Sequence, residues 1–251
     1  MSDNKPIPLR NDPWSRFRAA TQARINLGRS GDALPTPALL QFQADHARAR
    51  DAVHGAVDFA ALADAVAPHP SIAVQSRAGD RSTYLRRPDL GRRLSESSAA
   101  ALPRTGPWDI LFVVADGLSA QAVTAHAATT LKACMARLPG WRIAPVVLAA
   151  QSRIALGDEA GGIMKADMVA VLVGERPGLS VADSLGIYLT WNPKIGCKDS
   201  ARNCISNIHA AGLSPDQAAA KLAWLAGEAK NRQLTGVDLK EDADTPLLPG
   251  G

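Results

Sequence analysis

Short runs of apolar residues alternate with longer segments of helical periodicity through the centre of the chain. The clearest runs span 110–114, 145–149 and 169–173, and a shorter one spans 72–74. Their length and their content of branched residues are typical of strands buried on both faces, as in parallel sheets. Because segments of helical pattern lie between them, the order predicts an α/β fold with a parallel sheet flanked by helices.

Two further extended segments and a helix follow the run at 169–173. Residues 186–191 are apolar, and residues 202–208 alternate polar and apolar side chains as a half-buried strand does. The sequence Ser214-Pro215-Asp216-Gln217 is a capping box with proline at the first helical position, so it predicts the start of the last helix. The tail at 241–251 is polar and rich in Gly and Pro, so we expect it to be disordered.

The first 70 residues carry a different pattern, with helix signals and no strand run. Asp12-Pro13 predicts a helix that Gly28 closes, because Trp14, Phe17, Thr21 and Ile25 follow at helical spacing. Thr36-Pro37 predicts a second helix, and Asp58 a third that runs through Val66. We therefore expect a helical region at 1–70 with a flexible arm, an α/β domain at 71–240 and the tail at 241–251.

The composition excludes several classes of protein. The net charge of +4 and the aromatic content of 4% are too low to indicate nucleic-acid binding. No apolar run approaches the roughly 18–20 residues of a membrane span, and the first residues lack the apolar core of a signal peptide. The three cysteines, an odd number without C-x-x-C spacing, favour a reducing cytosol. We expect a cytoplasmic protein without nucleic-acid or membrane partners.

Candidate chemistry lies where the strands end, because open α/β sheets bind ligands beyond the carboxyl ends of their strands. Glu175 follows the run at 169–173, and its carboxylate is either desolvated for a ligand or paired with Arg176. Asp116 follows the run at 110–114 and suits either a ligand or metal, or the cap of the next helix. Ile154 suits contact with a large flat ring or ordinary core packing.

Other residues leave their role more open. Cys204 could be a nucleophile, but no histidine is placed beside it, so we interpret it as a buried thiol. Asp158 and Glu159 could hold a cation or favour a helix N-terminus. An arginine-rich stretch predicts either a face for phosphate or an acidic partner, or a solvated surface. It consists of Arg77, Arg81, Arg86, Arg87, Arg92 and Arg93.

Seven sequence blocks, in order, resemble the small subunit of ethanolamine ammonia-lyase, an adenosylcobalamin-dependent enzyme. The blocks are HARARDAVH from His46, YLRRPDLGRRL from Tyr84, VVADGLSA from Val113, QSRIALGDE from Gln151, GERPGLS from Gly174, DSLGIYLT from Asp183 and RNCISNI from Arg202. Together they cover roughly residues 13–240. Nucleotide-binding patterns such as G-x-G-x-x-G after a strand do not occur in the sequence.

The resemblance implies a helical N-terminal part and a Rossmann-like domain that covers one side of adenosylcobalamin. The cofactor would lie against a large TIM-barrel subunit that binds ethanolamine, within a higher hetero-oligomer. It would bind base-on, with no histidine ligand from the protein. Its contacts carry over to Ile154, Glu175 and Cys204, and we add Asp116 because it stands at a neighbouring strand end. Ser152 stands where the family pattern usually has Gly, so its side chain could crowd a corrin ring.

The sequence therefore predicts the cobalamin-binding small subunit of an ethanolamine ammonia-lyase, which converts ethanolamine to acetaldehyde and ammonia and is active only with its large subunit. We expect it in the cytoplasm, with a bacterial microcompartment as the alternative. A second hypothesis is a stand-alone Rossmann-like hydrolase or phosphotransferase that uses Asp116, Asp158 and Glu175 around a divalent metal. A third is an assembly subunit without a cofactor.

Overall fold

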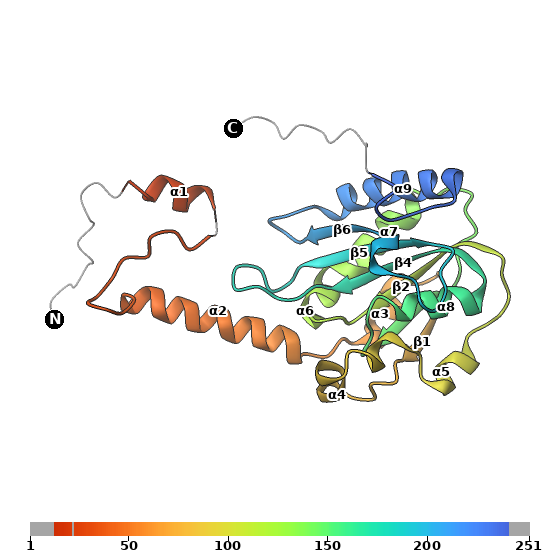
Figure 1. Ribbon diagram of the computed structural model, residues 1–251, viewed down its shortest axis with the longest axis horizontal. Helices are drawn as coiled ribbons and strands as arrows, with labels where there is room; N and C mark the ends of the chain where they lie inside the picture. Colours follow the sequence, from red (N-terminus) through yellow and green to blue (C-terminus); the bar gives the residue numbers. More distant parts are fainter. Residues whose placement is uncertain (1–12, 22, 241–251) are drawn as a thin grey trace.

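A six-stranded sheet with helices on both faces forms the centre of the molecule (Figure 1). The computed structural model describes residues 13–21 and 23–240. The strands, in chain order, are β1 (Ser71–Gln75), β2 (Trp108–Ala115), β3 (Val146–Ala150), β4 (Ala166–Gly174), β5 (Leu185–Trp191) and β6 (Arg202–Ile208). Every strand that the sequence predicts is confirmed, and no bound differs from the prediction by more than three residues.

The sheet is mixed, so the expectation of a parallel sheet is only partly right. The strands lie in the order β1-β3-β2-β4-β5-β6. The first four in this order run parallel, whereas β5 is antiparallel to both β4 and β6. A parallel crossover needs a dozen or more residues and usually a helix, whereas the connections at 175–184 and 192–201 have about ten residues each and lack an α-helix. Both connections therefore return the chain antiparallel.

The helices connect and cover the strands. They are α1 (Ser15–Ala20), α2 (Thr36–His54), α3 (Phe59–Val66), α4 (Arg81–Arg86), α5 (Glu96–Ala101), α6 (Ala120–Ala122), the π-helical η2 (Val123–Ala127), α7 (Ala128–Ala136), α8 (Leu156–Met164) and α9 (Pro215–Arg232), with the 3-10 turns η1 (Leu90–Arg92) and η3 (Asp199–Ala201). The segment predicted as one helix from Ser119 to Arg137 is thus α6, η2 and α7 in succession. The capping box at Ser214 is confirmed, with reciprocal hydrogen bonds to Gln217.

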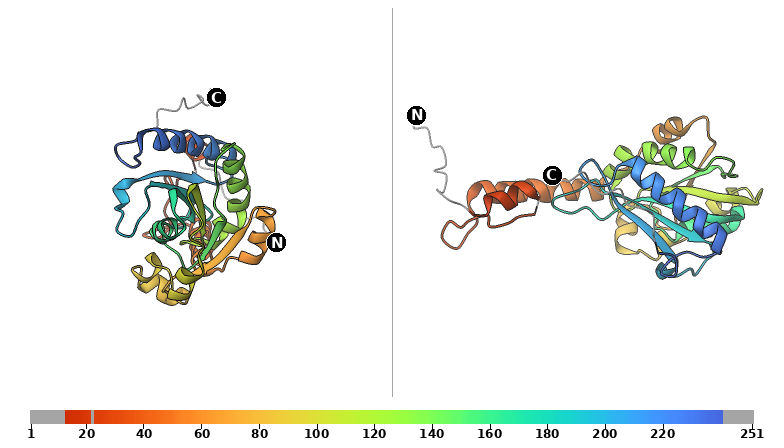
Figure 2. Two further views of the ribbon diagram at one scale, coloured as in Figure 1. Left: turned by 90° about the vertical axis from the view of Figure 1, so that its right-hand side faces the viewer. Right: turned by 90° about the horizontal axis from the view of Figure 1, so that it is seen from above.

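Two apolar layers hold the sheet between its helices, as Figure 2 shows with α9 on one side and α8 on the other. Alternate residues of β4 supply both layers. Met168, Ala170 and Leu172 pack with α3, η2, α7 and α9, whereas Val169, Val171 and Val173 pack with α8. Strand alternation on a fully covered sheet explains why the run at 169–173 is apolar at every position.

On the α8 face, the outer strands are not fully covered. Tyr188 of β5 is half-buried, and Cys204 and Ser206 of β6 are exposed, although Leu189 and Ile205 on the other face are buried under α9. The helix α8 stops short of this area because its residues pack on β2 and β4. This bare strip of β5 and β6 adjoins the loops that follow β3 and β4, and its Tyr188 lines one wall of a surface depression.

The helices α1 and α2 extend away from the sheet, whereas α3 packs against it (Figure 1). The helix expected up to Gly28 is wrong in extent, because α1 ends at Ala20 and buries none of its residues. A helix of this length is marginal without packing, and nothing covers it among the described residues to lengthen it. Its expected cap, Asp12, lies outside the described residues, as do the arm at 1–11 and the tail at 241–251.

The second and third N-terminal helices are confirmed. The helix α2 begins at Thr36, with Pro37 in its first turn, and α3 runs from Phe59 to Val66 with Asp58 accepting a hydrogen bond from the Ala61 amide. In residues 13–21 and 23–240, no helix has the length and apolar character needed to cross a membrane.

Candidate functional site

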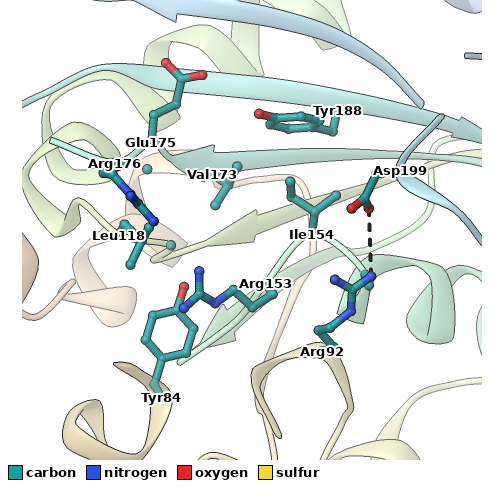
Figure 3. A pocket seen from close by; sticks show the side chains of 13 residues that line it. Tyr84, Arg92, Leu118, Arg153, Ile154, Val173, Glu175, Arg176, Tyr188 and Asp199 are labelled. Atoms are coloured by element: carbon teal, nitrogen blue, oxygen red, sulfur yellow. Dashed lines mark ion pairs between the residues drawn. The ribbon is translucent and has the colours of Figure 1, made fainter. Parts of the chain in front are cut away.

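A pocket of about 510 Å³ opens at the carboxyl ends of β2 and β4, on the same face as α8 (Figure 3). Its base combines apolar side chains with the bare part of β5, and its rim carries charged groups. The lining residues are Tyr84, Arg92, Gly117, Leu118, Arg153, Ile154, Ala155, Val173, Gly174, Glu175, Arg176, Tyr188 and Asp199. The pocket therefore lies where an open α/β sheet binds its ligands.

Ile154 lies on the loop between β3 and α8 and contributes an apolar surface to the pocket. It is half-buried and packs at the margin of the apolar layer under α8. Figure 3 shows its side chain beside the Tyr188 ring. The interpretation as core packing thus holds in part, since one side of Ile154 packs on the core and the other lines the pocket. Its contact with a cofactor stays a prediction.

Asp116 holds the loop that carries Ile154, and it does not line the pocket. It is 5% exposed, and its carboxylate accepts hydrogen bonds from the amides of Gln151 at 2.8 Å and Ser152 at 2.9 Å. Burial raises the pKa of Asp116, and these amide bonds oppose the shift. The expected helix cap is supplied instead by Ser119, whose hydroxyl accepts from the Ala122 amide. A role of Asp116 in cofactor binding stays a prediction. In the structure, Asp116 anchors the loop that follows β3.

Ser152 does not narrow the pocket. It is completely buried, its hydroxyl donates to the carbonyl oxygen of Arg153 at 3.2 Å, and it is absent from the pocket lining. A serine where the family pattern has Gly is therefore accommodated on the inner side of the loop.

Glu175 begins the connection from β4 to β5 and lies across the start of β5. Its carboxylate accepts hydrogen bonds from the Ser184 hydroxyl at 2.5 Å and from the Asn207 amide at 3.3 Å. A Cβ atom at Gly186 would lie 2.8 Å from its Oε1 atom, so the glycine makes room for the side chain. Glu175 is half-buried, and among the described residues it forms no ion pair with Arg176. The alternative that pairs the two is wrong, because the side chain bends toward β5.

Tyr188 of β5 lines the pocket, whereas Cys204 of β6 lies beside it on the bare strip and is not among the lining residues. They are opposite each other in the strand pairing. The interpretation of Cys204 as a buried thiol is wrong, because alternation along β6 turns it to the uncovered face, where it is exposed. Partial desolvation still raises the pKa of its thiol. A thiol that stays protonated is a poor nucleophile, so Cys204 is better suited to contact a ligand than to react with it.

Most arginines of the arginine-rich stretch make contacts within the protein that stabilise the fold. Arg93 donates two hydrogen bonds to Glu159, at 2.9 and 3.2 Å, and Arg81 donates to the carbonyl oxygens of Val53 and Gly117. Of the six arginines of this stretch, Arg92 has the clearest position at the pocket, where its guanidinium lies 3.8 Å from Asp199. The sequence could not separate these roles because all six arginines have the same local pattern.

The metal hypothesis loses its geometric basis. Asp158 is 1% exposed and accepts two hydrogen bonds from the Arg202 guanidinium, at 2.6 and 2.7 Å, while Asp116 and Glu175 accept hydrogen bonds from other groups. Each of these carboxylates has its own separate protein partner. Within residues 13–21 and 23–240, no group of three or more His, Cys, Asp or Glu side chains is arranged to hold a metal ion.

Tyr84, Arg153 and Tyr188 are among the pocket residues that were not singled out from the sequence. Tyr188 carried a usable signal, because it alternates with Ile187 and Leu189 and so faces away from the layer under α9. Tyr84 is completely buried, and its hydroxyl donates to the Ser152 carbonyl oxygen at 3.2 Å. Burial raises its pKa to about 12, so it is a neutral donor. Its contact with the loop after β3 is long-range, and no local pattern predicts it.

Residues 11–240 match the model of a protein family described as ethanolamine ammonia-lyase light chain. The chain belongs to the ethanolamine ammonia-lyase light-chain family. It is accordingly a subunit of a lyase. This match covers all the elements that build the pocket, from α4 to β6.

Curated relatives named ethanolamine ammonia-lyase small subunit are similar to this chain over nearly the whole length of both proteins. The chain is 52% identical to the protein of Xanthomonas campestris pv. campestris over 252 residues, covering 97% of this chain and 93% of the relative. It is 48% identical to that of Azotobacter vinelandii, covering 100% and 95% of the two chains. For Pseudomonas putida the identity is 50%, with 99% and 94% covered. The name "small subunit" implies a larger partner subunit.

Proposed function

We propose that the chain is the cobalamin-binding small subunit of an adenosylcobalamin-dependent ethanolamine ammonia-lyase. In this proposal residues 71–240 form a Rossmann-like domain, and its pocket on the α8 face covers one side of the cofactor. A large TIM-barrel subunit binds ethanolamine and closes over the other side, and the pair assembles into a higher hetero-oligomer. The helices α1, α2 and α3 of the N-terminal 70 residues serve the assembly. The free state of Cys134, Cys197 and Cys204 is compatible with a reducing cytoplasm.

The observation that carries this proposal is the bare strip of β5 and β6 beside Ile154 and Glu175. A flat, amphipathic ring needs an apolar platform with polar groups at its edge. Ile154, Val173 and Tyr188 supply the platform, and Glu175 stands at its margin. The pocket is open to one side, as expected for a site that a second subunit completes. The residues present therefore fit base-on adenosylcobalamin, whose periphery is mainly amide groups.

Each residue has a task that its geometry supports. Glu175 keeps acceptor capacity beyond its bonds to Ser184 and Asn207, so it can accept hydrogen bonds from amide groups of the cofactor. Ile154 and Tyr188 line the pocket and exclude water from the ring face. Cys204, opposite Tyr188 on β6 but outside the pocket lining, would contact only a ring that extends beyond the pocket. When bound, the cofactor supplies homolysis of its cobalt–carbon bond as the source of a radical. The substrate chemistry, which yields acetaldehyde and ammonia, takes place on the large subunit.

A titration with adenosylcobalamin tests the proposal on the complex of this chain with its large subunit. We expect Glu175→Ala to weaken cofactor affinity about tenfold or more, because charge-assisted hydrogen bonds contribute roughly 1.5–3 kcal/mol each. Gly186→Ala should also weaken cofactor affinity, because the new Cβ displaces the Glu175 carboxylate. Cys204→Ser should have a smaller effect because it changes little volume.

Glu228→Ala is the matched control, since Glu228 is also half-buried but lies on α9, across the sheet. It should leave the affinity unchanged, and circular dichroism verifies the fold of every variant. Equal affinity for wild type and Glu175→Ala would remove this residue from the site. A wild-type complex that binds no adenosylcobalamin would instead favour the assembly subunit without a cofactor.

A further inference from the structure

The charged groups of the pocket are unequally paired. Arg92 is balanced by Asp199 at 3.8 Å, and Glu175 is hydrogen-bonded to Ser184 and Asn207. In the described part of the chain, Arg153 and Arg176 have neither an ion pair nor a side-chain hydrogen bond. Two unpaired guanidinium groups in one pocket leave it with a positive potential.

Arg153 is held rigidly in this position. Its guanidinium carbon lies 4.4 Å from the centre of the Tyr84 ring, and its amide donates to the Gly91 carbonyl oxygen at 2.8 Å. A Cβ at Gly91 would lie 2.9 Å from the Tyr84 ring and 3.1 Å from the Arg153 side chain, so the glycine permits this close stack. The contacts fix the side chain of Arg153 before any ligand binds.

The stack also leaves the donors of Arg153 unused. Its Nε atom is buried and has no hydrogen-bond partner. Figure 3 shows the guanidinium above the Tyr84 ring, with the Arg176 side chain extending toward it. A buried donor without a partner is costly, and a planar guanidinium matches the oxygens of a carboxylate or phosphate. The arrangement therefore points to an anionic ligand group between Arg153 and Arg176.

We propose that Arg153, together with Arg176, binds the phosphodiester group of the cofactor. This inference rests on the proposed function. The side chains on the corrin periphery are neutral amides, so the phosphodiester that links the ring to the nucleotide base is its one peripheral anion. An arginine pair recognises the phosphodiester by its charge as well as by hydrogen bonds. The pair would thus select cofactors that retain the nucleotide tail.

Three probes separate the phosphodiester from the rest of the cofactor. They are adenosylcobalamin, adenosylcobinamide, which lacks both the phosphodiester and the base, and adenosylcobinamide methyl phosphate, which keeps the phosphodiester but lacks the base. Each is titrated into the complex with the large subunit, using wild type, Arg153→Gln and Arg176→Gln. Arg176 is exposed, so its variant tests the proposal without risk to the fold. Arg87→Gln, at a surface pair with Asp89 outside the pocket, is the matched control.

We expect Arg153→Gln to weaken binding of both phosphate-containing probes about tenfold and to leave adenosylcobinamide within about twofold of wild type. Arg176→Gln should show the same selectivity with a smaller loss. An equal loss on all three probes, or no loss, overturns the inference while wild-type binding keeps the proposed function intact. Weaker association of the subunits with unchanged cofactor affinity overturns it too, because a carboxylate of the large subunit would then be the anion. Absence of cofactor binding by the wild-type complex overturns both.

Discussion

At the scale of single residues, Asp109 is the clearest electrostatic anchor outside the pocket. It lies at the start of β2 and is 5% exposed. Its carboxylate accepts hydrogen bonds from the Arg142 amide at 2.7 Å and guanidinium at 3.1 Å, and from Lys230 of α9 at 3.0 Å. The Arg142 hydrogen bond, against the opposing effect of burial, holds the pKa of Asp109 far below its ordinary value of 3.8. This carboxylate therefore fastens α9 to the sheet only when it is ionised.

The depressed pKa predicts a pH-dependent contribution to stability. Because Asp109 is harder to protonate in the folded state, its stabilising effect is complete above pH 3.8 and declines as pH falls toward the folded pKa. We expect Asp109→Asn to lower the free energy of unfolding by about 1–3 kcal/mol at neutral pH. The difference from wild type should shrink steadily below pH 4 in urea denaturation.

Asp89→Asn is the control, because the Arg87–Asp89 pair is exposed and should contribute little. A difference for Asp109→Asn that stays constant from pH 7 to pH 3 would contradict this role of the carboxylate.

Residues that follow strands were predictable, whereas residues that act through long-range contacts were not. The position of Glu175 after a buried strand, and of Ile154 in a loop after another, was enough to predict that both lie at the ligand edge. Arg153 and Tyr84 meet only because the loop after β3 packs on the segment around α4. The exposure of Cys204 could not be predicted either, because it depends on where α8 stops along the sheet.

At the scale of elements, periodicity located the strands but not all their directions. The apolar runs correspond to β1 to β4, and the alternating segment corresponds to β6. Connection length carried the missing information, because about ten residues without a helix cannot form a parallel crossover. The same reasoning explains the bare strip, since an antiparallel return brings no helix to cover β5 and β6 on the α8 face.

The carboxyl ends of β2 and β4 approach each other so closely that glycine is required. A Cβ at Gly174 would lie 2.1 Å from the Ser119 carbonyl oxygen and 2.8 Å from that of Asp116, and neither backbone can move freely. We expect Gly174→Ala to lower the free energy of unfolding by about 2–4 kcal/mol in denaturant titrations. The floor of the pocket should be lost with it, because Gly174 lines that floor.

Gly227 in α9 provides the matched comparison, because a Cβ at this position would meet no atom within 4 Å. Gly227→Ala should raise the free energy of unfolding by about 0.5–1 kcal/mol, as expected for an open helical site. Similar effects of the two substitutions would show that the close approach at Gly174 does not constrain the fold.

At the scale of the whole molecule, α2 presents apolar side chains away from the sheet. Leu39, Leu40 and Phe42 are between 38% and 58% exposed, and Trp14 and Phe17 of the N-terminal segment are comparably exposed. Such clusters usually mark a partner surface. We expect Leu40→Glu to weaken association with the large subunit about tenfold, measured by titration calorimetry, while stability is unchanged. Val237→Glu, at an exposed apolar residue beyond α9, should leave association unaffected. Unchanged association of Leu40→Glu would place this cluster outside the interface and confine the interface to the sheet domain.

The most direct test of cofactor binding in this pocket is a cryo-electron microscopy map of the chain in complex with its large subunit and adenosylcobalamin. We predict corrin density against Ile154 and Tyr188, with an amide group of the ring periphery within hydrogen-bond distance of Glu175. A corrin bound elsewhere, with this face of β5 and β6 covered by side chains of the large subunit, would contradict the proposed site.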